Sequence, residues 1–234
     1  MRVRRGYFDC RYGQLHVHSA MPAGGGFEEG TPLLCVHDLP GRGSTFTRFL
    51  ALAGGERSVY APDLPGFGES DGPTVRSEIA DFAAAVADFI DCLHLRQLAV
   101  LGLRSGALLA TELARLRPGE VSRVILVSVP PLTQAERVRA RGQLPPAAPQ
   151  GTSGPESLSW AIEAAARYPL RERLAKLPQR VLVLRPRDDL WEATGRAREA
   201  LPSARLLELE LSGFDLFACA PRRVAEAVRE FLRV

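Results

Sequence analysis

The stretch PDLPGFGES, residues 62–70, decides the fold of this 234-residue chain. It overlaps the end of a short apolar run, RSVYAPD at residues 57–63, which is typical of a strand. Its prolines and glycines are the strongest local signals for a turn. The stretch therefore predicts a buried strand that ends in a tight turn.

Five further runs resemble this strand: PLLCVHD (32–38), QLAVLG (97–102), RVILVSV (123–129), RVLVLRP (180–186) and RLLELEL (205–211). They lack strict alternation of apolar and polar residues, as expected for parallel strands buried on both faces. Near the N-terminus, two near-alternating segments flank Tyr12 and Gly13 and predict an antiparallel hairpin. Together these segments predict an eight-stranded, mostly parallel sheet.

Amphipathic helical stretches separate the strands. Residues 74–95 place apolar side chains on one stripe, and the C-terminal segment repeats this pattern with Val224, Val228 and Phe231. Parallel strands need crossover helices, so the alternation predicts a doubly wound α/β fold in a single domain, residues 1–234. Residues 131–176 break the alternation with a front part rich in Pro, Gly and Ser and a helical back part, which predicts a short cap insertion.

Five motifs follow the predicted strands in order: CVHDLPGRG (35–43), APDLPGFGESDGP (61–73), VLGLRSGA (100–107), VLVLRPRDD (181–189) and LSGFDLFACAP (211–221). Their order and spacing resemble the α/β-hydrolase superfamily, in the branch with an H-G-x-P-G oxyanion loop and a D-x-P-G-x-G-x-S turn. The resemblance covers nearly the whole chain and implies an α/β-hydrolase fold.

The resemblance also locates the nucleophile, which in this family lies at the centre of a G-x-nucleophile-x-G turn between strand and helix. Gly102 and Gly106 keep this frame and put Arg104, which cannot attack a carbonyl, at the nucleophile position. A frame shifted by one residue makes Ser105 the nucleophile instead. Its flanking positions would then be Leu103 and Ala107, and leucine fits poorly where the turn is tightest.

The other two triad positions follow from the same resemblance. The acid position corresponds to Asp189, with Asp188 beside it, and the position of the basic histidine holds Phe214. No histidine follows His94 in the chain. Loss of the nucleophile or of its base removes most of the rate of such a triad, so ordinary Ser-His-Asp hydrolysis is not expected.

The oxyanion loop departs from the family pattern as well. The His-Gly pair appears as His37-Asp38, which puts a carboxylate beside the N–H of Leu39 that would stabilise an oxyanion together with the N–H of Ser105. His37 is expected to be a structural part of this loop. These residues, with the triad positions, are expected to line the former active-site pocket.

An arginine at the elbow needs compensation, because the turn is strained and the following helix N-terminus repels a cation. We therefore predict a salt bridge from Arg104 to Asp38, to Asp189 or to both. In a structural role the pair only holds the loops together. In a functional role the guanidinium presents its fork to a ligand carboxylate or enolate.

Composition narrows the possible partners. Thirty basic and 27 acidic side chains leave a net charge of +3, and no long run of like charge indicates nucleic-acid or membrane binding. No apolar run has the length of a signal peptide or membrane span, so a cytoplasmic protein is expected. His16 and His18 could share a strand face as metal ligands, but without a recognisable third ligand neither metal nor cofactor is expected.

The leading functional interpretation is a pseudoenzyme with a degenerate catalytic triad. It would bind a small molecule, with carboxylates among the candidates, or act as an accessory protein. One alternative is a lyase, isomerase or cyclase in which Arg104 stabilises an anionic intermediate and Asp38 or Asp189 moves a proton. Others are a purely structural partner, and a hydrolase that uses Ser105. A homodimer is also possible, since two-fold dimers are the commonest oligomers.

Overall fold

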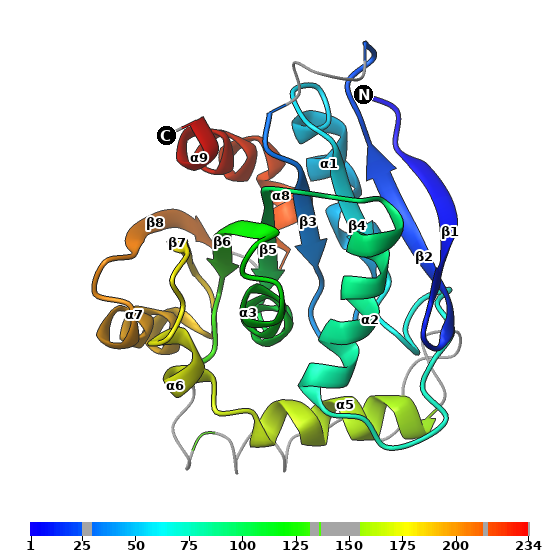
Figure 1. Ribbon diagram of the computed structural model, residues 1–234. Coiled ribbons are helices and arrows are strands. Elements are labelled where there is room, and N and C mark those ends of the chain that lie inside the picture. The colour runs from blue at the N-terminus through cyan, green and yellow to red at the C-terminus, as the bar shows by residue number, and fades with distance from the viewer. Residues whose placement is uncertain (25–29, 132–135, 137–154, 213–214, 234) are drawn as a thin grey trace.

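An eight-stranded sheet forms the centre of the computed structural model, which describes residues 1–24, 30–131, 136, 155–212 and 215–233 (Figure 1). The strands are β1 (Arg4–Cys10), β2 (Gly13–Ala20), β3 (Leu33–Val36), β4 (Val59–Pro62), β5 (Leu98–Leu103), β6 (Val121–Val127), β7 (Arg180–Arg187) and β8 (Arg205–Ser212). Their order across the sheet is β1-β2-β4-β3-β5-β6-β7-β8. β2 is antiparallel to both β1 and β4, and all other pairs are parallel. The predicted sheet and N-terminal hairpin are confirmed.

Helices cover both faces of the sheet. They are η1 (Gly43–Phe46), α1 (Thr47–Ala53), α2 (Ile79–Cys92), α3 (Gly106–Leu116), α5 (Pro155–Arg167), α6 (Leu170–Leu174), α7 (Trp191–Ala200), α8 (Leu216–Cys219) and α9 (Pro221–Arg233). Residues of α2, α3, α5, α6 and α7 belong to one apolar cluster, and residues of α1, α8 and α9 belong to a second. The predicted doubly wound arrangement is therefore present.

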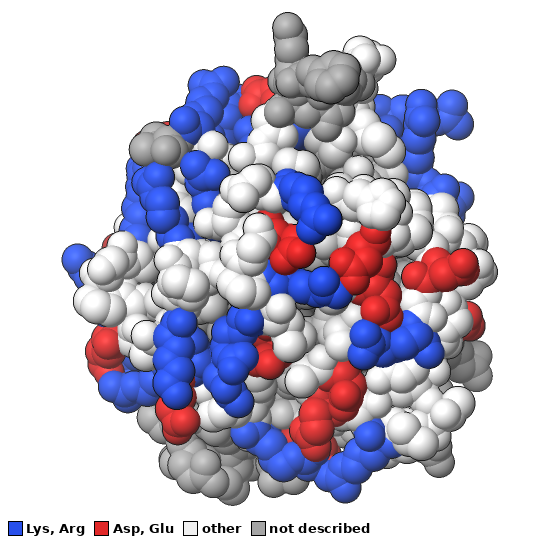
Figure 2. All heavy atoms as spheres, in the orientation of Figure 1, with Lys and Arg blue, Asp and Glu red and all other residues white. Residues whose placement is uncertain are grey.

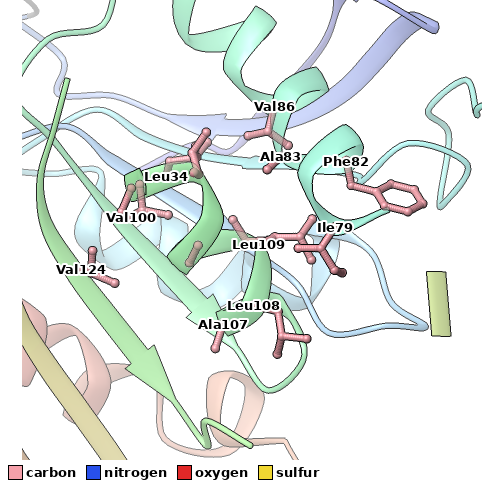
Figure 3. Packing of buried hydrophobic residues seen from close by; sticks show 14 of the residues in the cluster. Leu34, Ile79, Phe82, Ala83, Val86, Val100, Ala107, Leu108, Leu109 and Val124 are labelled. Carbon is pink, nitrogen blue, oxygen red and sulfur yellow. The ribbon is translucent and has the colours of Figure 1, made fainter. Parts of the chain in front are cut away.

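Neighbouring residues of the central strands point to opposite clusters. Leu34 and Val100 pack in the first cluster, and Figure 3 shows them facing residues of α2 and α3. Cys35 and Leu101, the next residue of each strand, pack in the second cluster. Both faces are buried, which is why these strands lack polar alternation. Each buried Leu or Val stabilises the fold by about 1.5–3 kcal/mol.

Helix α2 begins later than the stretch predicted from residue 74. The N–H of Glu78 donates to the Asp81 carboxylate at 2.8 Å, and the Glu78 side chain in turn accepts a hydrogen bond from the backbone of Asp81. This reciprocal pair forms a capping box that satisfies backbone groups at the start of the helix. The cap therefore begins the helix at Ile79, within the predicted stretch.

The turn that follows β4 folds around the carboxylate of Asp63. Asp63 accepts hydrogen bonds from the N–H groups of Gly43 at 2.6 Å and Glu69 at 3.0 Å. Gly68 has a φ of +57°, and a Cβ there would lie 2.1 Å from Asp63 Oδ2. Only glycine combines this left-handed conformation with such a close approach. The glycine of the motif is thus required by the buried aspartate.

The segment between β6 and β7 contains α5 and α6, in agreement with the helical back part predicted for the cap. In Figure 1, α5 lies on the side of the molecule toward which the parallel strands point. Most of the predicted front part, residues 132–135 and 137–154, lies outside the described residues. The carboxyl ends of β3, β5 and β7 meet at one edge of the sheet, where the triad and oxyanion-loop positions are expected.

The surface carries charges of both signs. On the face shown in Figure 2, acidic and basic side chains are interspersed. Across the part of the chain that the structure describes, none of the helices combines the length and apolar character needed to cross a membrane.

Candidate functional site

A sharp turn joins β5 to α3 and places Arg104 at its apex. Arg104 has a φ of +52°, whereas Ser105 has helical angles of −65° and −24°. A Cβ on Gly102 would lie 2.6 Å from the Cα of Ala107, and one on Gly106 would lie 2.4 Å from the carbonyl oxygen of Val36. Both glycines are therefore needed for close backbone packing. The left-handed residue of the elbow is Arg104, which favours the frame with Arg104 rather than Ser105 at the nucleophile position.

The guanidinium of Arg104 is surrounded by carboxylates from two loops. Its two terminal nitrogens donate to the two oxygens of Asp189, each at 2.8 Å. Its Nε lies 3.1 Å from Asp38 Oδ2, and one terminal nitrogen lies 3.6 Å from Asp188 Oδ2. The salt bridge predicted from the sequence is confirmed, and it includes both expected aspartates. Asp188, seen in the sequence only as a neighbour of the acid position, is a third member.

This network changes the acid–base properties of its members. The hydrogen bonds with Asp189 raise the pKa of Arg104 although burial opposes the charge, and the same bonds lower the pKa of the Asp189 carboxyl. Arg104 is 22% exposed, and the side chain of Asp188 only 6%. A paired, partly buried guanidinium stays charged at all physiological pH values. The acid position is therefore held as a carboxylate.

The carboxylate of Asp38 occupies the space in front of two backbone N–H groups. Its Oδ1 accepts hydrogen bonds from Leu39 N–H at 2.9 Å and from Ser105 N–H at 3.1 Å. The same oxygen accepts the hydroxyl proton of Ser105, whose Oγ in turn accepts from Leu39 N–H at 2.7 Å. By the family resemblance, these two N–H groups are the ones that would bind an oxyanion. Here a side chain of the protein itself supplies the anion.

His37 lies beneath this loop and is fully buried. Its Nδ1 lies 2.7 Å from the carbonyl oxygen of Asp38, and its Nε2 lies 2.9 Å from the N–H of Leu64. The first contact requires a proton on Nδ1 and the second a lone pair on Nε2, so the ring is neutral in this tautomer. Burial lowers its pKa, consistent with that state. Both ring nitrogens hold the backbone, which fits the structural role expected for His37.

The remaining sequence-predicted residue, Phe214 at the base position, lies outside the described residues. The described part of the loop includes Asp215, which accepts from the N–H of Ala218 and begins α8. The structure thus brings together Asp38, Leu39, Arg104, Ser105 and Asp189. Their placement follows from the loops after β3, β5 and β7, which open on the same edge of the sheet.

Residues 31–214 match the sequence model of the α/β-hydrolase fold family. The chain belongs to this family. The match begins after the N-terminal hairpin, includes the elbow and ends at Phe214.

Solved structures similar to this chain include enzymes of that fold. A thermophilic esterase from Thermogutta terrifontis superimposes with a TM-score of 0.78 at 21% identity and 98% coverage of both chains. The enol-lactonase from Burkholderia xenovorans LB400 superimposes with a TM-score of 0.78 at 20% identity, covering 98% of this chain and all of that one. At these identities the likeness concerns the fold alone.

Curated relatives match a smaller part of the chain. An uncharacterised protein of Mycobacterium tuberculosis is 30% identical over 105 residues, which are 45% of this chain and 31% of the relative. The dihydrolipoyllysine-residue acetyltransferase component of an acetoin cleaving system from Pseudomonas putida is 30% identical over 110 residues, 47% of this chain and 30% of that protein. The matched segment therefore spans less than a third of either relative.

Proposed function

We propose that this protein is a non-hydrolytic member of the α/β-hydrolase fold family that binds a small molecule or serves as an accessory protein. The observation that carries the proposal is the position of Asp38. Its carboxylate accepts from the N–H groups of Leu39 and Ser105, where a hydrolase would stabilise a developing oxyanion. An anion fixed there opposes the negative charge of a tetrahedral intermediate.

The nucleophile position supports the same proposal. Arg104 carries no nucleophilic oxygen or sulfur, and its fork is held by Asp189. Ser105 is a poor substitute, because its hydroxyl donates to the Asp38 carboxylate and accepts from Leu39. Attack by Ser105 would require a base that takes its proton, and the position of the family's histidine holds Phe214.

The charges of the centre limit the class of ligand. The two terminal nitrogens of the Arg104 guanidinium, which would form the fork expected for a ligand carboxylate, donate to Asp189, and its Nε faces Asp38. Three aspartates surround one arginine, which leaves an excess of negative charge. We therefore propose a neutral or cationic ligand, such as a primary amine, in place of the carboxylate considered from the sequence.

The alternative of lyase, isomerase or cyclase chemistry has less support. Such a reaction needs a carboxyl group with a raised pKa to hold and release a proton. The pKa of Asp189 is instead lowered by Arg104. The same ion pair also reduces the ability of Arg104 to stabilise an anionic intermediate.

The proposal is tested by measuring ester and thioester hydrolysis with p-nitrophenyl acetate and an acyl thioester, together with labelling by a fluorophosphonate probe. Loss of nucleophile and base lowers the turnover of such triads by about 10⁶-fold, so we expect rates equal to those of Ser105→Ala and no labelled serine. Hydrolysis that exceeds the Ser105→Ala background, with the probe attached to Ser105, would overturn the proposal.

The ligand class is tested separately by thermal shift with matched primary amines and carboxylates of equal carbon number. We expect stabilisation by at least one amine and by none of the carboxylates. A carboxylate that stabilises the protein and loses its effect in Arg104→Met would restore the original expectation.

A further inference from the structure

A second group of polar side chains lies where β2 meets the turn that follows β4. His16 and His18, two residues apart on β2, point to the same face, and Asp63 follows the neighbouring antiparallel strand β4. One ligand atom from each lies within 4.8 Å of the other two. The three residues are buried, with 2%, 8% and 2% of their surface exposed. Asp63 is therefore the third candidate ligand that could not be recognised beside His16 and His18 in the sequence.

Two of the three residues, His16 and Asp63, are already in direct contact. Nδ1 of His16 lies 2.9 Å from Oδ2 of Asp63. The carboxylate of Asp63 also accepts hydrogen bonds from the N–H groups of Gly43 and Glu69. A carboxylate has about four acceptor positions, and His16, Gly43 and Glu69 donate to three of those of Asp63. A metal ion can replace the hydrogen bond from His16. The other two would then hold the ligating carboxylate in place, as outer-shell hydrogen bonds do in metal sites.

His18 is the third candidate ligand. Its ring lies edge-on to that of His16, with centroids 4.7 Å apart and an angle of 81° between the planes. Two imidazoles on one zinc ion at about 2.0–2.1 Å have ring centres about 5 Å apart, close to this arrangement. Among the hydrogen bonds of the described residues, none involves a ring nitrogen of His18. A neutral imidazole offers a metal ion one ring nitrogen with a lone pair.

Glu69 faces the other nitrogen of His16. Its Oε2 lies 3.9 Å from His16 Nε2 and accepts a hydrogen bond from the hydroxyl of Tyr7 at 2.7 Å. The Glu69 side chain is 58% exposed, so it can change rotamer and approach His16 Nε2. Carboxylates that accept from the second nitrogen of a ligating histidine are a regular feature of zinc sites.

We propose that this cluster binds one divalent transition-metal ion, zinc in the first place, through His16 Nδ1, a ring nitrogen of His18 and Asp63 Oδ2, with water as the fourth ligand. The ion takes the place of the proton between His16 and Asp63. The proton that Nδ1 gives up is taken by Nε2 of the same ring, which keeps it and donates a hydrogen bond to Glu69, so the imidazole stays neutral and no proton is released. Two histidines and one carboxylate with an open fourth position are a donor set that zinc accepts.

The bound ion would join three segments of the fold. His16 and His18 belong to the N-terminal hairpin, Asp63 begins the PDLPGFGES turn, and Gly43, which donates to Asp63, begins η1 beside the oxyanion loop. Because none of these segments is covalently close to another, the ion would stabilise their contact. The site is separate from the Arg104 centre and does not depend on the function proposed for it.

The test is a zinc titration of the chelator-treated full chain, followed by competition with a chromophoric chelator and by mass spectrometry under native conditions. We expect one ion per chain. His18→Gln should weaken binding by about 100-fold or more, because loss of an outer-shell partner alone costs about 10–100-fold. This variant keeps the His16–Asp63 hydrogen bond, so circular dichroism should be unchanged. The matched control is His94→Asn, which alters an exposed histidine whose left-handed φ of 51° asparagine tolerates.

Cobalt substitution and a second variant complete the test. Bound cobalt should give tetrahedral d–d bands without the thiolate charge-transfer band that ligation by the exposed Cys92 or Cys219 would produce. If His18→Gln fails to fold, Glu69→Gln serves instead, with an expected loss of about 10–100-fold. The proposal is overturned if the wild type binds no stoichiometric zinc. It is also overturned if the wild type and the variant used bind zinc with equal affinity, or if His94→Asn loses binding.

Discussion

Replacing Arg104 by methionine removes one positive charge from among three carboxylates and keeps an unbranched side chain of similar length. Arg104 is 22% exposed, and its partners range from Asp188 at 6% to Asp189 at 46%. Loss of one partner of a buried pair costs about 3–5 kcal/mol, whereas an exposed pair contributes at most about 1 kcal/mol. For this partly buried network we expect the free energy of unfolding at pH 7 to fall by about 1.5–3 kcal/mol.

The loss should depend on pH in a defined direction. Hydrogen bonds from Arg104 hold the pKa of Asp189 below its usual range. A carboxyl with a lower pKa in the folded state adds stability above its unfolded pKa, about 3.9 for aspartate, and this stability is lost as the pH falls through the folded pKa. The difference between wild type and Arg104→Met is therefore complete at pH 7 and decreases below about pH 4.

The assay is urea unfolding followed by circular dichroism at pH 7 and at about pH 3. A double-mutant cycle with Asp189→Asn separates the pairwise energy from other effects of the substitution. Arg187→Met is the control, because Arg187 and its partner Glu210 are 55% and 71% exposed, and its loss should stay below about 1 kcal/mol. The reasoning is refuted if Arg104→Met lies within about 0.5 kcal/mol of the wild type at pH 7, or if its loss is equally large in acid.

Two further predictions concern the turn after β4 and the buried thiol. Gly68→Ala should lower the free energy of unfolding by about 2–4 kcal/mol, since its Cβ would meet Asp63 in a left-handed conformation. Gly119→Ala, where a Cβ meets nothing within 4 Å, is the control, and equal urea midpoints for the two variants would contradict the turn geometry. Burial raises the pKa of Cys35, so iodoacetamide should modify the exposed Cys92 in the native protein well before Cys35. Mass spectrometry of timed samples checks this order, and comparable rates at the two thiols would count against the burial.

The sheet and the frame of the elbow could be predicted from the sequence because they depend on local patterns. Apolar runs without alternation identified the strands that are buried on both faces. Gly102 and Gly106 fixed Arg104 at the apex, since only glycine allows the close backbone contacts on either side. The order of motifs also identified the family, and its G-x-nucleophile-x-G frame placed Arg104 at the nucleophile position. The first apolar residue of the predicted stripe, Ile79, is the first residue of α2, but the capping box that begins the helix at Glu78 is a side-chain contact that the periodic pattern does not specify.

The chemistry of the centre could be predicted only in part. A cation at a strained turn beside a helix N-terminus implied a carboxylate partner for Arg104. Asp38 and Asp189 were the candidates because of their place in the motifs. That Asp38 also fills the space in front of two N–H groups depends on its side-chain orientation and on Ser105, which lies 67 residues away in the chain. Sequence pattern does not specify such orientations, because packing against distant loops selects the rotamer.

The sequence alone thus determined which elements form, how they alternate and which residues stand at the positions of the family's triad. Tertiary structure decided which side chains meet: Arg104 with Asp189 across 85 residues, and His16 with Asp63 across 47. The first pair lies at the nucleophile position of the family pattern, and the second joins β2 to the turn that follows β4. The physical reason is that local propensity acts over a few residues, whereas a polar cluster exists only after the sheet has brought distant strand ends together.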